Sequence, residues 1–167
     1  PARSPVARNS WARWRSVSAR AGSPVLVAAC GALSIAAVNG PQQLTVAGTC
    51  TAITQFQERC RAQHIATAVL PVERAFHSPA MDRVLDAFHQ VASTVTYHPP
   101  TIPVIGNLTG KTVAAYSADY WVRHLRDTVR FHECVQSAQS AGADLMVEVG
   151  PHPVLTAMLR SLGQQAH

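Results

Sequence analysis

Residues 34–48, SIAAVNGPQQLTVAG, hold two short β-prone runs at 34–38 and 43–47, separated by Asn39-Gly40-Pro41. Asn-Gly followed by Pro is a turn signal, because glycine tolerates turn conformations and proline cannot continue the hydrogen bonding of a strand. The stretch therefore predicts a β-hairpin, or two adjacent strands, over residues 34–47.

Strand and helix patterns alternate outward from this hairpin. Residues 51–64 carry apolar side chains at helical spacing, and residues 66–72 form another β-prone run. A further helix is expected to begin at Ser78-Pro79, with Ser78 as its N-cap and an apolar face at positions 81, 84, 85, 88 and 91. Later expected elements are a strand at 102–105, helices at 119–125 and 132–141, a buried strand at 145–149 and a helix at 154–162. This alternation predicts an α/β fold.

The basic residues are concentrated at one end of the chain. The 14 Lys and Arg residues exceed the nine acids by five, and five of the 14 are arginines within residues 1–23, which hold no acid. The rest of the chain is therefore neutral. A nucleic-acid-binding face needs cations spread over a folded surface, so no nucleic-acid partner is expected. Residues 1–23 have few aliphatic side chains and no periodicity, and we expect a disordered basic tail there.

Other simple classes are disfavoured by the spacing of particular residue types. The four cysteines form no CxxC pair, which indicates a reduced protein of the cytoplasm. No apolar run approaches the ~20 residues of a membrane span, so no membrane partner is expected. The eight histidines show neither an HExxH motif nor a repeated ligand spacing, and no metal site is expected.

Three segments could carry chemistry. In Arg74-Ala75-Phe76-His77-Ser78-Pro79, an imidazole at a strand-to-helix junction could act as a general base, although it could also be a surface histidine beside a capping serine. The segment 147–155, VEVGPHPVL, reads mainly as a tight turn from strand to helix, with His152 in the turn. The segment 120–131 reads as a packed helix followed by a turn.

Five stretches together resemble the acyltransferase domains of modular polyketide synthases and their fatty-synthase relatives. They are SIAAVNGP, LTVAG, RAFHSPAMD, YWVRHLRDTVRF and EVGPHPVL, in the family's order, and the resemblance covers residues 33–159. It implies that a serine in a GxSxG elbow is acylated by an acyl-coenzyme A. The acyl group then passes to the phosphopantetheine thiol of an acyl carrier protein, with other synthase domains as partners and no bound cofactor.

The resemblance also implies roles for individual residues. His77 matches the histidine that activates the serine, and the backbone at Val129 and Arg130 matches the segment that orients it. Asn39 matches a position near the acyl site. Phe76 matches the bulky residue of malonyl-type domains, whereas Arg74 departs from the usual first residue of that motif. Thr128 replaces the proline common before VRF.

The serine motif itself is missing from the 167 residues, since no GxSxG occurs in them. The resemblance implies a partial acyltransferase fold: an incomplete ferredoxin-like subdomain at 24–72, lacking its first strand, and the carboxyl-terminal part of the larger α/β subdomain at 73–167. We expect such a fragment to be inactive alone. The alternatives are a non-catalytic interaction module, or one half of a split acyltransferase whose serine is encoded separately.

Overall fold

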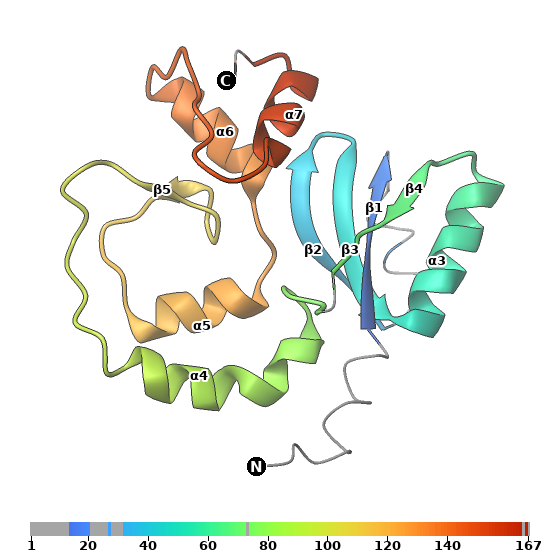
Figure 1. The fold of residues 1–167 in the computed structure, drawn as a ribbon, viewed down its shortest axis with the longest axis horizontal. Coiled ribbons are helices and arrows are strands. Elements are labelled where there is room, and N and C mark those ends of the chain that lie inside the picture. The colour runs from blue at the N-terminus through green and yellow to red at the C-terminus, as the bar shows by residue number, and fades with distance from the viewer. Residues whose placement is uncertain (1–13, 21–26, 28–31, 73, 165, 167) are drawn as a thin grey trace.

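A computed structural model describes residues 14–20, 27, 32–72, 74–164 and 166. Its main sheet is antiparallel, with the strand order β2-β3-β1-β4 (Figure 1). The strands are β1 (Trp14–Arg20), β2 (Leu33–Gly40), β3 (Gln43–Thr49) and β4 (Thr67–Val69), and helix α3 (Cys50–Ala62) joins β3 to β4. Strands β2 and β3 pair directly across the Asn39-Gly40-Pro41 segment, so the predicted hairpin is confirmed.

Strand β1 corrects the expectation of a disordered tail over residues 1–23. Residues 14–20 lie in the interior of the sheet, where Val17 faces Val46 of β3 on one side and Val69 of β4 on the other. The ferredoxin-like sheet therefore has its first strand, which also moves the boundary expected at residue 24. The reason is tertiary: two neighbouring strands satisfy the hydrogen bonds of a segment whose own apolar residues are only Trp14, Val17 and Ala19. The other residues of that expected tail lie outside the described residues.

The two faces of the sheet have separate cores. Helix α3 covers one face, where Val17, Val46 and Phe56 are among the fully buried residues. Its N-cap is Thr49, whose hydroxyl accepts from the Ala52 N–H. On the opposite face, Ala36 and Ala47 pack against the segment around Met81, with Leu125 of a later helix beside them. The second part of the chain thus packs against this face of the sheet.

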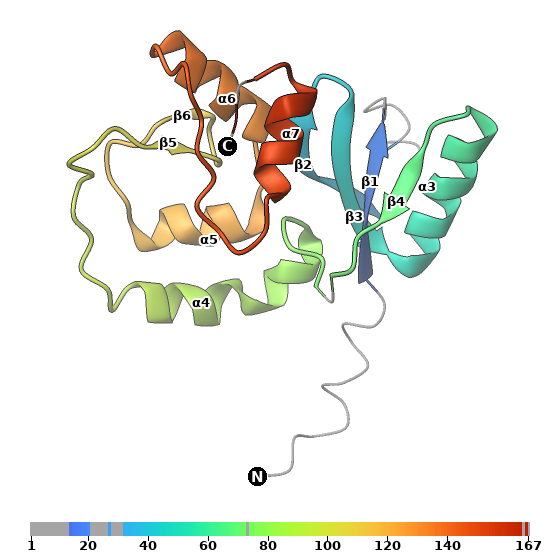
Figure 2. The same ribbon diagram turned by 45° about the horizontal axis from the view of Figure 1, so that its top comes forward.

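That second part is mainly helical. Its elements are the 3-10 helix η1 (Pro79–Val84), α4 (Leu85–Ala92), β5 (Ile105–Gly106), β6 (Lys111–Thr112), α5 (Ala118–Arg126), α6 (Phe131–Ser140) and α7 (Val154–Ser161). Helices α4 and α5 run alongside each other beneath the short β5–β6 ladder, and α6 and α7 lie near the end of β2 (Figure 2). The three helices expected between residues 119 and 162 are confirmed.

Two expectations about strands in this part are wrong. Residues 102–105 contribute only Ile105 to a two-residue strand, and residues 145–149 form no strand beyond an isolated bridge from Met146 to Ala166. The second segment is exposed rather than buried, with Val149 96% accessible. A strand needs neighbouring strands to satisfy its backbone, and the described residues offer this segment only the single bridge to Ala166.

No helix in the described part of the chain is both long and apolar enough to cross a membrane. The same residues contain no group of three or more potential metal ligands.

Candidate functional site

His77 lies at the turn that leads from the sheet into η1. Its backbone has φ +60°, in the left-handed region, which costs a non-glycine residue about 1–3 kcal/mol. Two contacts hold this turn in place. The His77 N–H donates to the Leu125 carbonyl at 3.1 Å, and the buried Ser78 hydroxyl donates to the Ala75 carbonyl at 2.6 Å. The same hydroxyl accepts from the Ala80 N–H, which confirms Ser78 as the expected N-cap.

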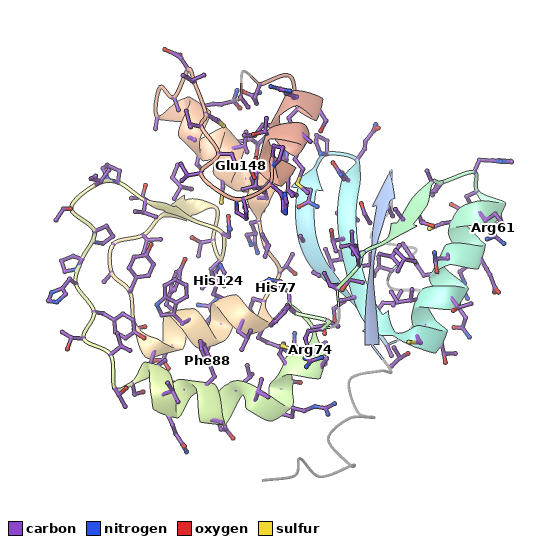
Figure 3. The ribbon with its side chains drawn as sticks, in the orientation of Figure 1. Arg61, Arg74, His77, Phe88, His124 and Glu148 are labelled. Carbon is purple, nitrogen blue, oxygen red and sulfur yellow. The ribbon has the colours of Figure 1, made fainter. Side chains whose placement is uncertain are left out.

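The imidazole of His77 is held by a main-chain carbonyl. Its Nδ1 lies 2.9 Å from the oxygen of Asp127, and the ring packs edge-on against His124 with ring centroids 5.9 Å apart (Figure 3). A carbonyl oxygen can only accept, so Nδ1 must carry the proton. In the neutral ring Nε2 is then an unprotonated acceptor, which is the form that a general base requires.

Burial lowers the pKa of His77 below its ordinary value of 6.5. The hydrogen bond to the Asp127 carbonyl opposes this shift, and the charge of His124 adds to it. The pKa of His124 is lowered as well, again because burial disfavours the charged ring. The first change favours a neutral His77 at neutral pH, ready to accept a proton, and the second favours a neutral His124 beside it.

The residue that orients His77 differs from the expected ones. The expectation was backbone from Val129 and Arg130, but the carbonyl at Nδ1 belongs to Asp127. Val129 instead pairs with β2, through its N–H to Ala36 and its carbonyl to Val38, and the Arg130 N–H donates to Asn107. The expected segment is two to three residues away from Asp127 in sequence, and the backbone of Val129 instead fastens the loop to β2.

A cavity of about 580 Å³ opens beside His77, between β2 and the end of α5. Among its lining residues are His77, Ile35 and Thr128, together with Arg123, Arg126 and Arg130. Each of these three arginines contacts an acid: Arg123 pairs with Asp127, Arg126 with Asp82, and Arg130 with Glu133. The cavity is therefore polar but largely charge-compensated. It leaves room for other groups to reach the imidazole.

The predicted substrate-binding residues Phe76, Arg74 and Asn39 are not among the described residues that line this cavity. Phe76 precedes His77 and is 48% exposed, so its ring is available to a neighbouring ligand. Arg74 is exposed on the same segment (Figure 3). Asn39 is buried in β2, where its amide donates to the Thr45 hydroxyl at 3.2 Å.

The EVGPHPVL segment leads into α7, which begins at Val154, but the strand expected before the turn is absent from the described residues. The Glu148 carboxylate accepts from the N–H groups of Leu155 and Thr156, at 3.0 and 2.7 Å, and so closes the start of α7. These backbone hydrogen bonds lower the pKa of Glu148. His152 is exposed in the turn. The segment thus caps the start of α7.

Sequence reasoning missed two contributors to the site. Asp127 and Leu125 act on His77 through their main-chain oxygens, and a main-chain oxygen leaves no mark on residue type. The available signal was positional: both lie where α5 ends, and the last carbonyls of a helix have no partner within it.

An imidazole with a fixed tautomer, facing a cavity at a strand-to-helix turn of an α/β fold, has the form that a general base requires. Comparison with known proteins gives the family. The family model described as "Acyl transferase domain" matches residues 7–167, and this chain belongs to that family. The match also begins earlier than the resemblance expected from residue 33.

Several relatives are polyketide synthases. The chain is 45% identical over 130 residues to polyketide synthase GfsA of Streptomyces halstedii, covering 77% of this chain and 2% of that protein. It is 41% identical over 138 residues to the spectinabilin polyketide synthase system protein NorB of Streptomyces orinoci, covering 81% and 6%. The chain therefore spans only a small part of these relatives.

Solved structures show the same fold. The acyltransferase domain from the second module of the salinomycin polyketide synthase matches with a TM-score of 0.84 and 41% identity, over 89% of this chain and 36% of that one. The expected partial acyltransferase fold is confirmed, and the chain spans about a third of this relative.

Proposed function

We propose that this chain supplies the histidine-bearing part of a polyketide-synthase acyltransferase site that transfers malonyl units from coenzyme A to an acyl carrier protein. The observation that carries the proposal is the hydrogen bond from His77 Nδ1 to Asp127, which leaves Nε2 as an acceptor beside an open cavity. Acyl transfer to a serine needs such a base, because a serine hydroxyl is a weak nucleophile until its proton is removed.

The proposed chemistry has two proton transfers through Nε2. In the first half-reaction Nε2 takes the proton of a serine hydroxyl as its oxygen attacks the thioester carbonyl of malonyl-coenzyme A. The carbon–sulfur bond breaks, and the proton passes to the departing thiol. In the second half-reaction Nε2 takes the proton of the carrier protein's phosphopantetheine thiol as its sulfur attacks the serine ester. The ester carbon–oxygen bond breaks, and Nε2 passes that proton to the serine oxygen.

The serine of this scheme lies outside the 167 residues, which contain no GxSxG. The exposed segment 145–149 supports a site completed by further protein. Leu145, Val147 and Val149 are all exposed, and a groove of about 220 Å³ beside them is lined mainly by apolar side chains such as Phe131 and Leu159. Apolar surface of this kind is typical of an interaction face. The proposed setting is the cytoplasm, with acyl-coenzyme A as substrate.

Phe76 is the proposed selector of the acyl unit. It precedes the base directly, and its exposed ring could occupy the space that the methyl group of methylmalonyl would need. Arg74, two residues before Phe76, is proposed as a further substrate-binding residue.

Complementation tests the proposal. The full chain is mixed or co-expressed with the serine-bearing amino-terminal part of a related acyltransferase and incubated with malonyl-coenzyme A, and intact mass is recorded. We expect a malonyl adduct on the partner fragment, followed by its transfer to added carrier protein. A mixture that forms a stable complex but never carries the adduct would count against the proposal.

A further inference from the structure

Thr128 lies between the two residues that define the orienting loop. Asp127, before it, supplies the carbonyl at His77 Nδ1, and Val129, after it, pairs with β2. The Thr128 hydroxyl donates to the carbonyl of Ile35 at 2.6 Å. This bond connects the loop to a strand 93 residues earlier in the chain, immediately beside the cavity.

A bulge in β2 makes this contact possible. The pairing of β2 with β3 shifts register between Ile35 and Ala37, so that Ala36 is the extra residue. Successive carbonyls of a regular strand point to opposite edges. Here the adjacent carbonyls of Ile35 and Ala36 both accept from the loop, from Thr128 Oγ1 and from the Val129 N–H. The bulge thus presents two neighbouring acceptors to one loop.

The Asp127 peptide is therefore held from both sides. On its amino-terminal side the Asp127 N–H donates to Arg123 at 2.7 Å and ends α5. On its carboxyl-terminal side the hydroxyl of Thr128 and the N–H of Val129 fasten the chain to the bulge. The Thr128 hydroxyl makes the sheet contact that is nearest in sequence to Asp127. A side-chain substitution can remove this contact, whereas it cannot remove the N–H of Val129.

We propose that Thr128 is a positioning residue for His77, whose hydroxyl keeps the Asp127 carbonyl at Nδ1 and thereby keeps Nε2 unprotonated toward the cavity. The effect of Thr128 on the His77 tautomer does not depend on the proposed acyl transfer. Only the role of His77 as a general base rests on that proposed function. Thr128 does not touch the imidazole in this scheme. It acts through the loop.

The main-chain carbonyl of His124 also hydrogen-bonds the imidazole, but it raises the pKa of His77 less than the Asp127 carbonyl does. Helix α5 presents His124 against the ring and lines the cavity with Arg123 and Arg126. Arg130 lines the cavity from the start of α6, and Asp82 of η1 is paired with Arg126. The arginines are donors only. The Asp127 side chain is engaged by Arg123, and the Asp127 main-chain oxygen, 2.9 Å from Nδ1, is the stronger main-chain acceptor and selects the tautomer.

The tautomer of His77 in the intact chain is the quantity to measure. Histidine-selective ¹H–¹⁵N NMR reports which ring nitrogen carries the proton, and His77→Gln identifies the His77 signals. Above the titration of the ring we expect the parent to carry the proton on Nδ1. In Thr128→Val and Thr128→Ala the ratio of the Nδ1–H to the Nε2–H form should fall roughly two- to tenfold, the range set by one net hydrogen bond.

Two further variants separate positioning from general stability. Thr128→Ser keeps the hydroxyl and should restore the parental ratio. Thr94→Val removes a comparable hydroxyl contact, from Thr94 to the Val91 carbonyl at 2.8 Å on an exposed turn, and should leave the ratio unchanged. The proposal is wrong if Thr128→Val and Thr128→Ala stay folded with the parental ratio.

It is also wrong if both variants lose the fold, since the hydroxyl would then serve the whole chain rather than the ring. A ratio that changes as expected, in a chain that fails to support acyl transfer on complementation, would leave the positioning role intact. That outcome would count against the proposed function alone.

Discussion

His77 and Asp127 are 50 residues apart in sequence, and a 2.9 Å hydrogen bond joins the ring Nδ1 of the first to the main-chain oxygen of the second. The bond connects the turn before η1 with the end of α5, and both elements pack on the same face of the sheet. The protonation of a candidate catalytic base is therefore set by how two distant segments meet on β2 and β3.

Replacing His77 by Ala in the complemented enzyme should lower malonyl transfer by about 10²–10⁴-fold, the usual cost of losing a general base. Steady-state transfer to carrier protein measures the effect. His98→Ala, at an exposed position after α4, is the matched control and should retain the parental rate. A His77→Ala enzyme that transfers malonyl at the parental rate would show that the base lies elsewhere.

Phe76→Ser should change the choice of acyl unit. The smaller side chain opens space beside His77, so use of methylmalonyl-coenzyme A should rise relative to malonyl-coenzyme A. One methyl group in a pocket is worth about 1–3 kcal/mol, which predicts a relaxed preference rather than a complete switch. Competition between the two thioesters, read by mass on the carrier protein, measures the ratio. An unchanged ratio would remove Phe76 from the acyl site.

Stability should fall as the pH is lowered below about 6.5, the ordinary pKa of histidine. Burial lowers the pKa values of His77 and His124 in the folded chain, so the unfolded chain binds more protons in this range. The contribution of the two histidines to stability is fully present above their pKa in the unfolded chain. It is lost as the pH falls through their lower pKa in the folded chain.

The measurement is denaturant unfolding at several pH values between 7 and 5. Replacing both His77 and His124 by Gln should flatten the dependence, whereas His98→Gln controls for the loss of one imidazole. Glu148, whose pKa is lowered from 4.5, titrates below this pH range and so does not contribute to the pH dependence measured there. An equally steep dependence in the double variant would contradict the prediction.

Strand β1 should be essential for the fold. Val17 is 0% exposed between β3 and β4, so Val17→Asp buries a carboxylate without a partner and should destabilise the chain by more than ~3 kcal/mol. Val91→Asp, on the exposed side of α4, is the control and should have little effect. Both are read by denaturant unfolding. Equal stability of the two variants would mean that residues 14–20 are dispensable.

The sequence predicted the hairpin and the helices, and it indicated His77 as the candidate base. Asn39-Gly40-Pro41 indicates the hairpin turn, Ser78-Pro79 indicates the start of η1, and RAFHSP indicates His77, because turns, caps and motifs are written in neighbouring residues.

Tertiary structure decided the rest. Residues 14–20 become a strand because β3 and β4 pair with them, whereas the more apolar residues 145–149 do not, because the described residues give them no neighbouring strand. Asp127 orients His77 through its carbonyl, and Thr128 reaches the carbonyl of Ile35 across 93 residues. Every residue except proline has the same backbone donor and acceptor, so residue type cannot tell which of them will meet. Only the packing of α5 and its loop against the bulge in β2 makes that choice.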